Sequence, residues 1–337
     1  MTLTRLVHTL HLTPIRFSLV SVSLVCFGLG MGMNVVFAEP LKVVSYNVEN
    51  LFYPERDSLK DDSEWTPEGE RRWSYTRYYR KVENIARVLT NIGEWDGVDI
   101  VGLQEVENAL CVKRLCYTLR RGEYDFVHYE SPDRRGIDVA LIYKKSRVDT
   151  IATRAIKVKG ERVNGERLIT RDILYVCAQI DKQDTVHFFV CHLPSQRGGK
   201  AESEWKRRVA KEVLQGAIDS VYLAFRDPKI IVMGDFNGAP KEDIRGVKNR
   251  MIVESQKSKV ERPNGTHKYQ GRWTCLDHFY TSPSLDSLSR AEIYNAAWIQ
   301  EPDEKYLDLK PKRTYNGFRY QKDGFSDHLP IVLTVSL

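Results

Sequence analysis

Short apolar runs alternate along the chain with longer periodic segments. The short runs are rich in β-branched and aliphatic residues, and they predict strands at 41–45, 98–103, 137–143, 173–180, 186–191, 230–233 and 330–335. Two other segments repeat apolar side chains at helical spacing: Tyr78, Val82, Ile85, Leu89 and Ile92, then Trp205, Val209, Val213, Ala217 and Val221. Thr66-Pro67 predicts a helix start ahead of the first segment. Strands mostly separated by helices indicate α/β layers with a mixed sheet.

The length of 337 residues would accommodate two domains of ~150 residues, or one large sheet-rich domain. A hydrophobic content of 42%, a charged content of 28% and a mean hydropathy of −0.42 exclude a disordered, collagen-like or multi-span membrane protein. The formal charge is +6, and it is +4 without residues 1–38, which hold Arg5 and Arg16 and no acidic residue. So small a charge does not imply nucleic-acid binding, and any basic surface must be local.

Residues 1–38 have the features of an export signal. Arg5 and Arg16 precede or border an apolar stretch at 17–29, and the segment ends in Val36-Phe37-Ala38, with small or apolar residues where a signal peptidase cuts. A retained membrane anchor is the alternative, but the uncharged stretch is short for a span. We therefore expect cleavage near Ala38 and a secreted or periplasmic mature protein.

Five cysteines follow the leader, and an odd number does not suggest a disulfide framework in a domain of this size. Cys177 and Cys191 lie on two apolar runs that flank a polar turn, so they could be neighbours across a hairpin. Buried free thiols are the favoured state, and whether these two cysteines pair stays open.

Polar and ionisable residues stand where the apolar runs end. They are Asn47, Glu49, Glu105, His192, Asp235, Asn237, Asp277, Asp327 and His328. Any one of them could be a turn or cap residue, but the same pattern in six segments indicates a site, because layered α/β folds present ligands and catalysts at strand ends. Carboxylate and amide oxygens suit Mg²⁺ or Mn²⁺, and histidines act as general acids or bases. Without a phosphate-loop, serine-hydrolase or zinc-protease motif, this chemistry points to water attacking a phosphate ester.

Five segments, in order along the chain, resemble the motif set of the endonuclease/exonuclease/phosphatase superfamily, in its deoxyribonuclease I-like, exported bacterial form. They are 45–52 (SYNVENLF), 102–106 (GLQEV), 192–195 (HLPS), 234–237 (GDFN) and 326–330 (SDHLP). The resemblance implies a four-layer α/β sandwich, in which two mixed β-sheets pack face to face with helices outside. It also implies a single domain at residues 39–337, after the signal peptide at 1–38.

The resemblance assigns metal binding to Glu105, Asn47, Glu49 and Asp327. Glu105 would be the principal ligand, and Asn47 would lie beside it on the phosphate or the metal. Glu49 stands where some members have a second acidic ligand, and Asp327 resembles a carboxylate on the metal side.

The resemblance assigns the catalytic steps to five further positions. Asp235 would orient or deprotonate the attacking water, and Asn237 would bind phosphate oxygens. His328 would be the catalytic histidine, oriented by Asp277. His192 stands where nuclease- and sphingomyelinase-like members have a histidine on the leaving-group side, whereas apurinic endonucleases have a tyrosine there.

Weaker candidates flank these motifs. Arg135 and Arg197 lie in turns where a guanidinium could hold phosphate. Asp138 could orient His192 or cap a turn. His278 would point away from the site on a strand, and no partner motif accompanies the remaining histidines, His128, His187 and His267.

The segment 55–81 interleaves basic and aromatic residues, which could hold single-stranded nucleic acid by stacking and phosphate contacts. An acidic cluster in the same segment would repel a phosphate backbone. We therefore favour a structural role, in which the aromatic side chains pack on the helix that follows.

We expect an exported, Mg²⁺- or Mn²⁺-dependent phosphodiester hydrolase, and we favour an endonuclease that cleaves DNA or RNA. The alternatives are a sphingomyelinase-like enzyme and an inositol phosphate or phosphoinositide phosphatase; we see no long apolar hairpin for membrane insertion. A non-catalytic binding module is a minor alternative, because the catalytic set is complete. The expected partner is nucleic acid or another phosphoester substrate, and we expect a monomer without an obligate protein partner.

Overall fold

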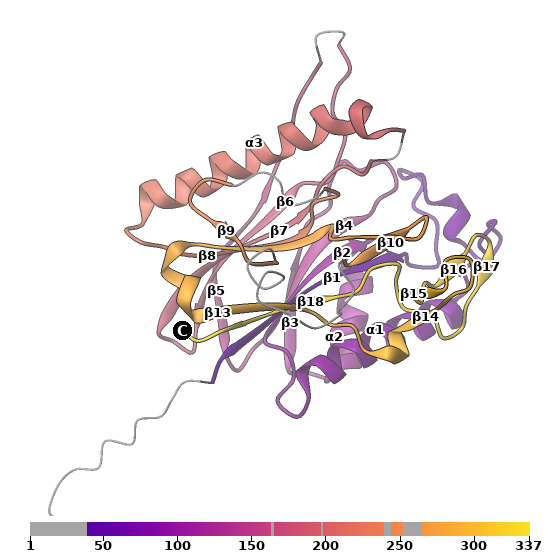
Figure 1. Cartoon of the computed structure of the whole chain (residues 1–337), viewed down its shortest axis with the longest axis horizontal. Helices are drawn as coiled ribbons and strands as arrows, with labels where there is room; N and C mark the ends of the chain where they lie inside the picture. Colours follow the sequence, from indigo (N-terminus) through magenta and orange to yellow (C-terminus); the bar gives the residue numbers. More distant parts are fainter. Residues whose placement is uncertain (1–38, 163–164, 197, 239–243, 252–264) are drawn as a thin grey trace, which may run out of the picture. The chain divides into compact units, whose positions relative to one another are not determined.

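Two six-stranded mixed sheets lie face to face at the centre of the fold (Figure 1). The computed structural model describes residues 39–337 except 163–164, 197, 239–243 and 252–264. The predicted leader and Arg197 therefore lie outside the described residues.

The first sheet has the strand order β13-β18-β1-β2-β4-β3. Its strands are β1 (Leu41–Leu51), β2 (Ile100–Val106), β3 (Tyr124–His128), β4 (Asp138–Lys144), β13 (Ser289–Ile293) and β18 (Ile331–Val335). β1 and β2 run parallel, and the other neighbours are antiparallel.

The second sheet has the strand order β5-β6-β7-β8-β12-β9. Its strands are β5 (Val148–Ile156), β6 (Ile173–Ile180), β7 (Asp184–His192), β8 (Lys229–Asp235), β9 (Lys248–Asn249) and β12 (Asp277–Thr281). Here β7 and β8 form the parallel pair. Each sheet therefore contains one parallel pair, whose two strands end at the same sheet edge.

Apolar side chains from both sheets fill the space between them. Val43, Leu141, Phe188 and Met233 are among the buried members of this core. Gly102, in the middle of β2, is required by this packing, because a Cβ atom there would lie 2.6 Å from the Met233 Sδ atom.

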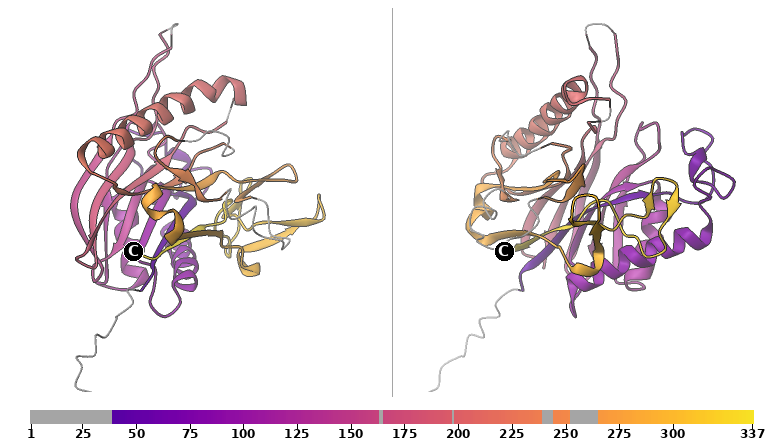
Figure 2. Two further views of the ribbon diagram at one scale, coloured as in Figure 1. Left: turned by 60° about the vertical axis from the view of Figure 1, so that its left-hand side comes forward. Right: turned by 45° about the vertical axis from the view of Figure 1, so that its right-hand side comes forward.

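Helices cover the outer face of each sheet, which confirms the four-layer sandwich. α1 (Tyr75–Gly93) and α2 (Ala109–Leu119) pack on the first sheet, and α3 (Lys200–Ala224) packs on the second. The right-hand view in Figure 2 shows α3 and α1 on opposite sides of the sheets. The predicted stripe on α1 is buried from Tyr78 to Ile92.

The helix start predicted at Thr66-Pro67 is wrong. α1 begins at Tyr75, and the Ser74 side chain accepts a hydrogen bond from the Arg77 backbone N–H at its N-terminus. The chain before Ser74 instead forms turns and a short 3₁₀ helix, η1 (Ser63–Trp65).

Aromatic side chains of the 55–81 segment pack into the core around Phe52. Trp65 stacks on Phe52 with ring centroids 4.9 Å apart, and it contacts Trp73 and Tyr315 edge-on. Trp65 and Trp73 are buried, and Arg71 lies over the Trp65 ring. These contacts give the segment a structural role.

Three two-stranded hairpins lie outside the sheets. They are β10 (His267–Tyr269) with β11 (Arg272–Thr274), β14 (Gln300–Asp303) with β15 (Asp308–Pro311), and β16 (Tyr315–Asn316) with β17 (Arg319–Tyr320). The 3₁₀ helices η2 (Pro283–Leu288) and η3 (Ala297–Ile299) complete the described elements.

Cys177 lies opposite His187 in the β6–β7 hairpin, so Cys177 and Cys191 are not paired across it. The described cysteines are free thiols: Cys111, Cys116, Cys177, Cys191 and Cys275. Among the helices of the described chain, none has the length and apolar character needed to cross a membrane.

Gly102→Ala should lower the free energy of unfolding by ~1–3 kcal/mol, because the added methyl group overpacks the space against Met233. Gly216→Ala, on α3, is the matched control, since a Cβ atom there meets nothing within 4 Å outside the helix's own backbone. That variant should be neutral or stabilise the protein by up to ~1 kcal/mol. Urea unfolding of both variants measures the difference, and equal stabilities would contradict tight packing between the sheets.

Candidate active site

Strand register brings the motif residues to one end of the two sheets. Asn47, near the end of β1, pairs with Gln104 of β2, the residue before Glu105. On the second sheet, His192 ends β7 and pairs with Asp235, which ends β8. The strands of each pair are parallel, so their carboxyl ends meet.

Asp235 lies at the centre of the site. Its Oδ2 accepts a hydrogen bond from the Asn47 Nδ2 at 3.1 Å and lies 3.6 Å from the His192 Nε2 and 3.9 Å from the His328 Nε2. Its Oδ1 accepts the Asn237 backbone N–H at 2.8 Å. Burial raises the pKa of Asp235 to about 7, although nearby His328 opposes this rise.

His328 is oriented by Asp277, as the resemblance implies for this pair. The distance from the His328 Nδ1 to the Asp277 Oδ2 is 2.8 Å, and the Thr266 hydroxyl donates to the same oxygen at 2.5 Å. Burial disfavours the imidazolium, but Asp277 and Asp235 outweigh it and raise the pKa of His328 well above its ordinary value. These carboxylates therefore favour the imidazolium form of His328.

His192 has the opposite electrostatic character. Its Nε2 lies 3.8 Å from the Glu105 Oε1, and its side chain is almost fully buried. Burial, with positive Arg171 and Arg135 nearby, lowers the pKa of His192 well below its ordinary value. The surroundings thus favour the neutral form of one imidazole and the charged form of the other, and both have Nε2 within 4 Å of Asp235.

Several residues at the site have left-handed backbone conformations. Positive φ angles occur at Glu49 (53°), Asn50 (55°), Glu105 (66°) and Asn237 (47°). At Glu105 this conformation coincides with a register irregularity between Gln104 and Val106 in the β2–β4 pairing. Such conformations cost free energy and persist only where the surrounding structure fixes them.

Glu49 is a buried carboxylate that forms ion pairs with the buried Lys81 and with the half-exposed Arg313. Its carboxylate lies 3.1 Å from the Arg313 Nε and 3.8 Å from the Lys81 Nζ, and it accepts the Thr314 backbone N–H at 2.7 Å. Burial and nearby Asp327 raise the pKa of Glu49 to about 7. These contacts make Glu49 an anchor for the 313–314 segment.

Asp327 accepts a hydrogen bond from the Arg313 Nη2 at 3.0 Å. Although burial opposes ionisation, His328 and Arg313 dominate and lower the pKa of Asp327 to about 2. Asp327 is therefore a carboxylate under all ordinary conditions.

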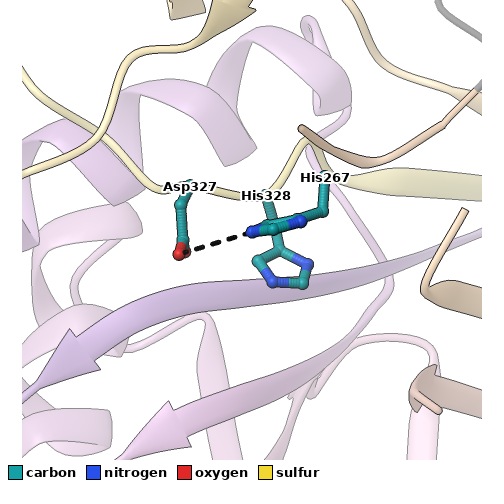
Figure 3. Close-up of side chains that lie close together, drawn as sticks. All are labelled: His267, Asp327 and His328. Atoms are coloured by element: carbon teal, nitrogen blue, oxygen red, sulfur yellow. Dashed lines mark ion pairs between the residues drawn. The ribbon is translucent and has the colours of Figure 1, made fainter. Parts of the chain in front are cut away.

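His267 belongs to this cluster although no sequence motif indicated it. Its ring centroid lies 4.9 Å from that of His328, and its Nε2 lies 3.9 Å from the Asp327 Oδ2 (Figure 3). A β-bridge between His267 and His328 brings them together, and such long-range pairing leaves no mark on local sequence.

The weaker candidates divide between the site and its surroundings. Arg135 lies close enough to His192 to lower its pKa. The described contacts of Asp138 run to Ser131 and His128 rather than to His192. His278 is buried and its Nε2 lies 3.0 Å from the Gly238 carbonyl oxygen, which confirms that it points away from the site.

Arg171 is a site neighbour that sequence reasoning missed. Its guanidinium donates to the Asp133 carboxylate at 2.9 Å and to the Leu193 carbonyl at 3.3 Å. It therefore ties the 131–136 loop to the residue that follows His192.

The donor chemistry of the site fits a hard divalent cation. Glu105, Asn47 and Asp327 offer carboxylate and amide oxygens, the ligands that Mg²⁺ and Mn²⁺ prefer. The Glu105 Oε2 accepts the Asn50 backbone N–H, and its side chain is 15% exposed, so its carboxylate is accessible. One ligand atom each of His267, Asp327 and His328 also lies within 4.8 Å of the others.

Comparison with protein families finds a match between residues 42–336 and the Endonuclease/Exonuclease/phosphatase family. A comparison with curated protein sequences finds no match.

Solved structures show the same fold at low sequence identity. TDP2 from C. elegans aligns with a TM-score of 0.57 and 16% identity over 88% of this chain and 75% of that protein. A mannosyl-6-phosphatase from Bacteroides thetaiotaomicron gives a TM-score of 0.55 and 16% identity over 87% and 98% of the two chains. The catalytic domain of human Nocturnin gives 0.52 and 17% over 88% and 93%.

Proposed function

Because this chain belongs to the endonuclease/exonuclease/phosphatase family, whose members hydrolyse phosphoester bonds with a divalent metal, we propose that it is an exported nuclease. In this proposal it cleaves phosphodiesters of DNA or RNA as a monomer built from the single domain at 39–337. The observation that carries the chemistry is the pair of imidazoles whose Nε2 atoms lie 3.6 Å (His192) and 3.9 Å (His328) from the Asp235 Oδ2.

Glu105, Asn47 and Asp327 would hold the metal, which we take to be Mg²⁺ or Mn²⁺. Such an ion stabilises negative charge that grows on phosphate oxygens in the transition state. Glu49 would act indirectly, because its carboxylate is bound by Arg313 and Thr314.

Asp235 would orient the attacking water and accept its proton, which its raised pKa of about 7 favours. Asn237 would bind a phosphate oxygen, and its position is fixed by a hydrogen bond from its Nδ2 to the Leu193 carbonyl at 3.0 Å. His328, oriented by Asp277, would hold positive charge on one side of the phosphate. On the other side, His192 would donate a hydrogen bond to the leaving oxygen, which takes up its proton from solvent water. In-line displacement requires control of protons and charge at both the attacking and the leaving oxygen.

Exposed aromatic side chains beside the site support a nucleic-acid substrate. Tyr269 is 68% exposed, two residues after His267, and Phe318 is 66% exposed on the turn of the hairpin that follows Arg313. Bases stack on such rings without sequence preference.

The turn of the β14–β15 hairpin carries Glu304 and Lys305 together with Tyr306 and Leu307, which is 93% exposed. The hairpin has only four residues in each strand, and this shortness argues against a membrane-inserting lipid hydrolase. A sugar phosphate is the second candidate, because one similar structure is a mannosyl-6-phosphatase.

An activity screen tests the substrate and the metal together. We expect cleavage of plasmid DNA or RNA with Mg²⁺ or Mn²⁺, loss of activity in EDTA, and little turnover of sphingomyelin, inositol phosphates or mannose 6-phosphate. Glu105→Ala should remove most activity while circular dichroism shows an intact fold. Full activity after metal stripping would refute the metal role, and preferred turnover of a small phosphoester would refute the nuclease assignment.

His192→Ala and His328→Ala should each lower kcat by ~10²–10⁴, the usual range for lost acid–base catalysis. Asp277→Asn should resemble His328→Ala because the orienting carboxylate is lost, and Asp235→Asn should be at least as severe. The double histidine variant should fall well short of the product of the single effects, since the groups act on one step.

His187→Asn is the matched control, because His187 is a buried histidine on β7 whose Nδ1 lies 2.8 Å from the Tyr175 hydroxyl, away from the site. It should keep near-normal kcat if folded. If His192→Ala and His328→Ala both retain more than about a tenth of wild-type kcat, the proposed roles of the histidines are wrong. Catalysis would then depend on the metal and the carboxylates alone.

We also propose that residues 1–38 direct export and are removed. Protein from its native host should begin at or near Glu39 and lie outside the cytoplasm, because the leader ends in a signal-peptidase pattern. N-terminal sequencing measures this directly, and an intact Met1 terminus would contradict it.

A further inference from the structure

A second group of ligand-type side chains lies at the joined ends of β3 and β4. His128 is the last residue of β3, Asp138 is the first residue of β4, and Glu130 lies in the loop between them. One atom of each, an imidazole nitrogen or a carboxylate oxygen, lies within 4.8 Å of the other two. None of the three belongs to the family-like motifs that build the active site.

The His128 imidazole is buried without a partner for one nitrogen. Its side chain is 3% exposed, and its Nε2 has no hydrogen-bond partner among the residues that the structure describes. The nearest carboxylate oxygen, the Asp138 Oδ2, is 3.8 Å away, which is too long for a hydrogen bond. Burial of a polar atom without a hydrogen bond costs free energy, so a ligand bound to this nitrogen would stabilise the site.

Asp138 is fixed in place on the opposite side of this gap. The Ser131 hydroxyl and backbone N–H both donate to its carboxylate, whose side chain is 1% exposed.

Charge and ligand type together select the ion. Glu130 and Asp138 offer carboxylate oxygens, although burial raises the pKa of both groups, to about 7 for Asp138. The Lys60 Nζ lies 3.9 Å from the Glu130 Oε2 and donates to the Ser131 carbonyl at 2.9 Å, so its ammonium group opposes the binding of any cation held by charge alone. Imidazole nitrogen instead favours Zn²⁺ and its transition-metal neighbours.

We propose that His128, Glu130 and Asp138 form a Zn²⁺ site separate from the catalytic centre. The ion joins both ends of the 129–137 loop, which carries Arg135 beside His192 and Asp133 beside Arg171. Zinc binding thereby fixes a loop that faces the active site, and it does so whatever the substrate is.

Isothermal titration calorimetry with Zn²⁺ on the dialysed full chain tests the site, with metal content after dialysis as a second readout. His128→Asn should lose one equivalent of bound Zn²⁺, or bind it with an affinity lower by ~100-fold or more. Mutation of a residue that only supports a metal ligand already lowers metal affinity by about 10- to 100-fold. Glu130→Gln should weaken the same equivalent by ~10-fold and leave the fold intact, because its side chain is 57% exposed.

The Glu105→Ala variant distinguishes zinc binding at this site from metal binding at the catalytic centre. It should still bind the equivalent of Zn²⁺ that His128→Asn loses. His187→Asn is the control for loss of a buried imidazole and should bind Zn²⁺ as the wild type does. Equal zinc stoichiometry and affinity in the wild type, His128→Asn and Glu130→Gln would overturn the proposal, as would the absence of zinc binding to Glu105→Ala.

Discussion

The register of the two parallel strand pairs is the constraint on which the active site depends. Asn47 beside Gln104, and His192 beside Asp235, stand at strand ends that meet because the strands run in the same direction. Side chains alternate between the two faces of a strand, so a shift of one residue would turn each of these groups to the wrong side. The apolar core between the sheets prevents that shift, since it would expose one strand's buried side chains. The same packing that stabilises the fold thus positions the proposed catalytic groups.

Gathering carboxylates at one place has an electrostatic cost that the surrounding cations offset. Asp327 and Glu49 share Arg313, and Glu49 also lies near Lys81, whose side chain is fully buried. Lys81 donates to the Phe325 carbonyl at 2.7 Å, so α1 is linked directly to the segment that carries Asp327 and His328. Lys81 and Glu49 are both buried, so removing Lys81 would leave the Glu49 carboxylate without its buried counter-charge, which typically costs ~3–5 kcal/mol. The ion pairs of Arg313 are partly exposed to solvent and contribute less. The charges near the proposed metal ligands therefore also hold an outer helix to the site.

Sequence reasoning located strands and their polar ends because both are local signals. Segments 173–180 and 186–191 correspond closely to β6 and β7, and Asp277 and His328 do lie in contact. The prediction of a helix start at Thr66-Pro67 relied on favourable capping chemistry. It was wrong because Trp65 and Trp73, on either side of this pair, pack their rings into the core instead. His267, Arg171 and the ion pairs of Glu49 were missed because each depends on partners far away in the sequence. Such contacts arise only after the sheets assemble, so no local pattern announces them.

Chemistry and substrate choice occupy different parts of this fold. The sheets position groups that act on a phosphate, which every candidate substrate contains. The hairpins β10–β11 and β14–β15 lie beside His267 and are joined by Lys268, whose Nζ lies 2.6 Å from Asp308 and 3.4 Å from Asp303. Tyr269 belongs to β10, and its ring is exposed on this braced unit. Because the brace lies outside the sandwich core, hairpin residues can change without disturbing strand register, so the proposed substrate contacts can vary independently of the groups at the strand ends.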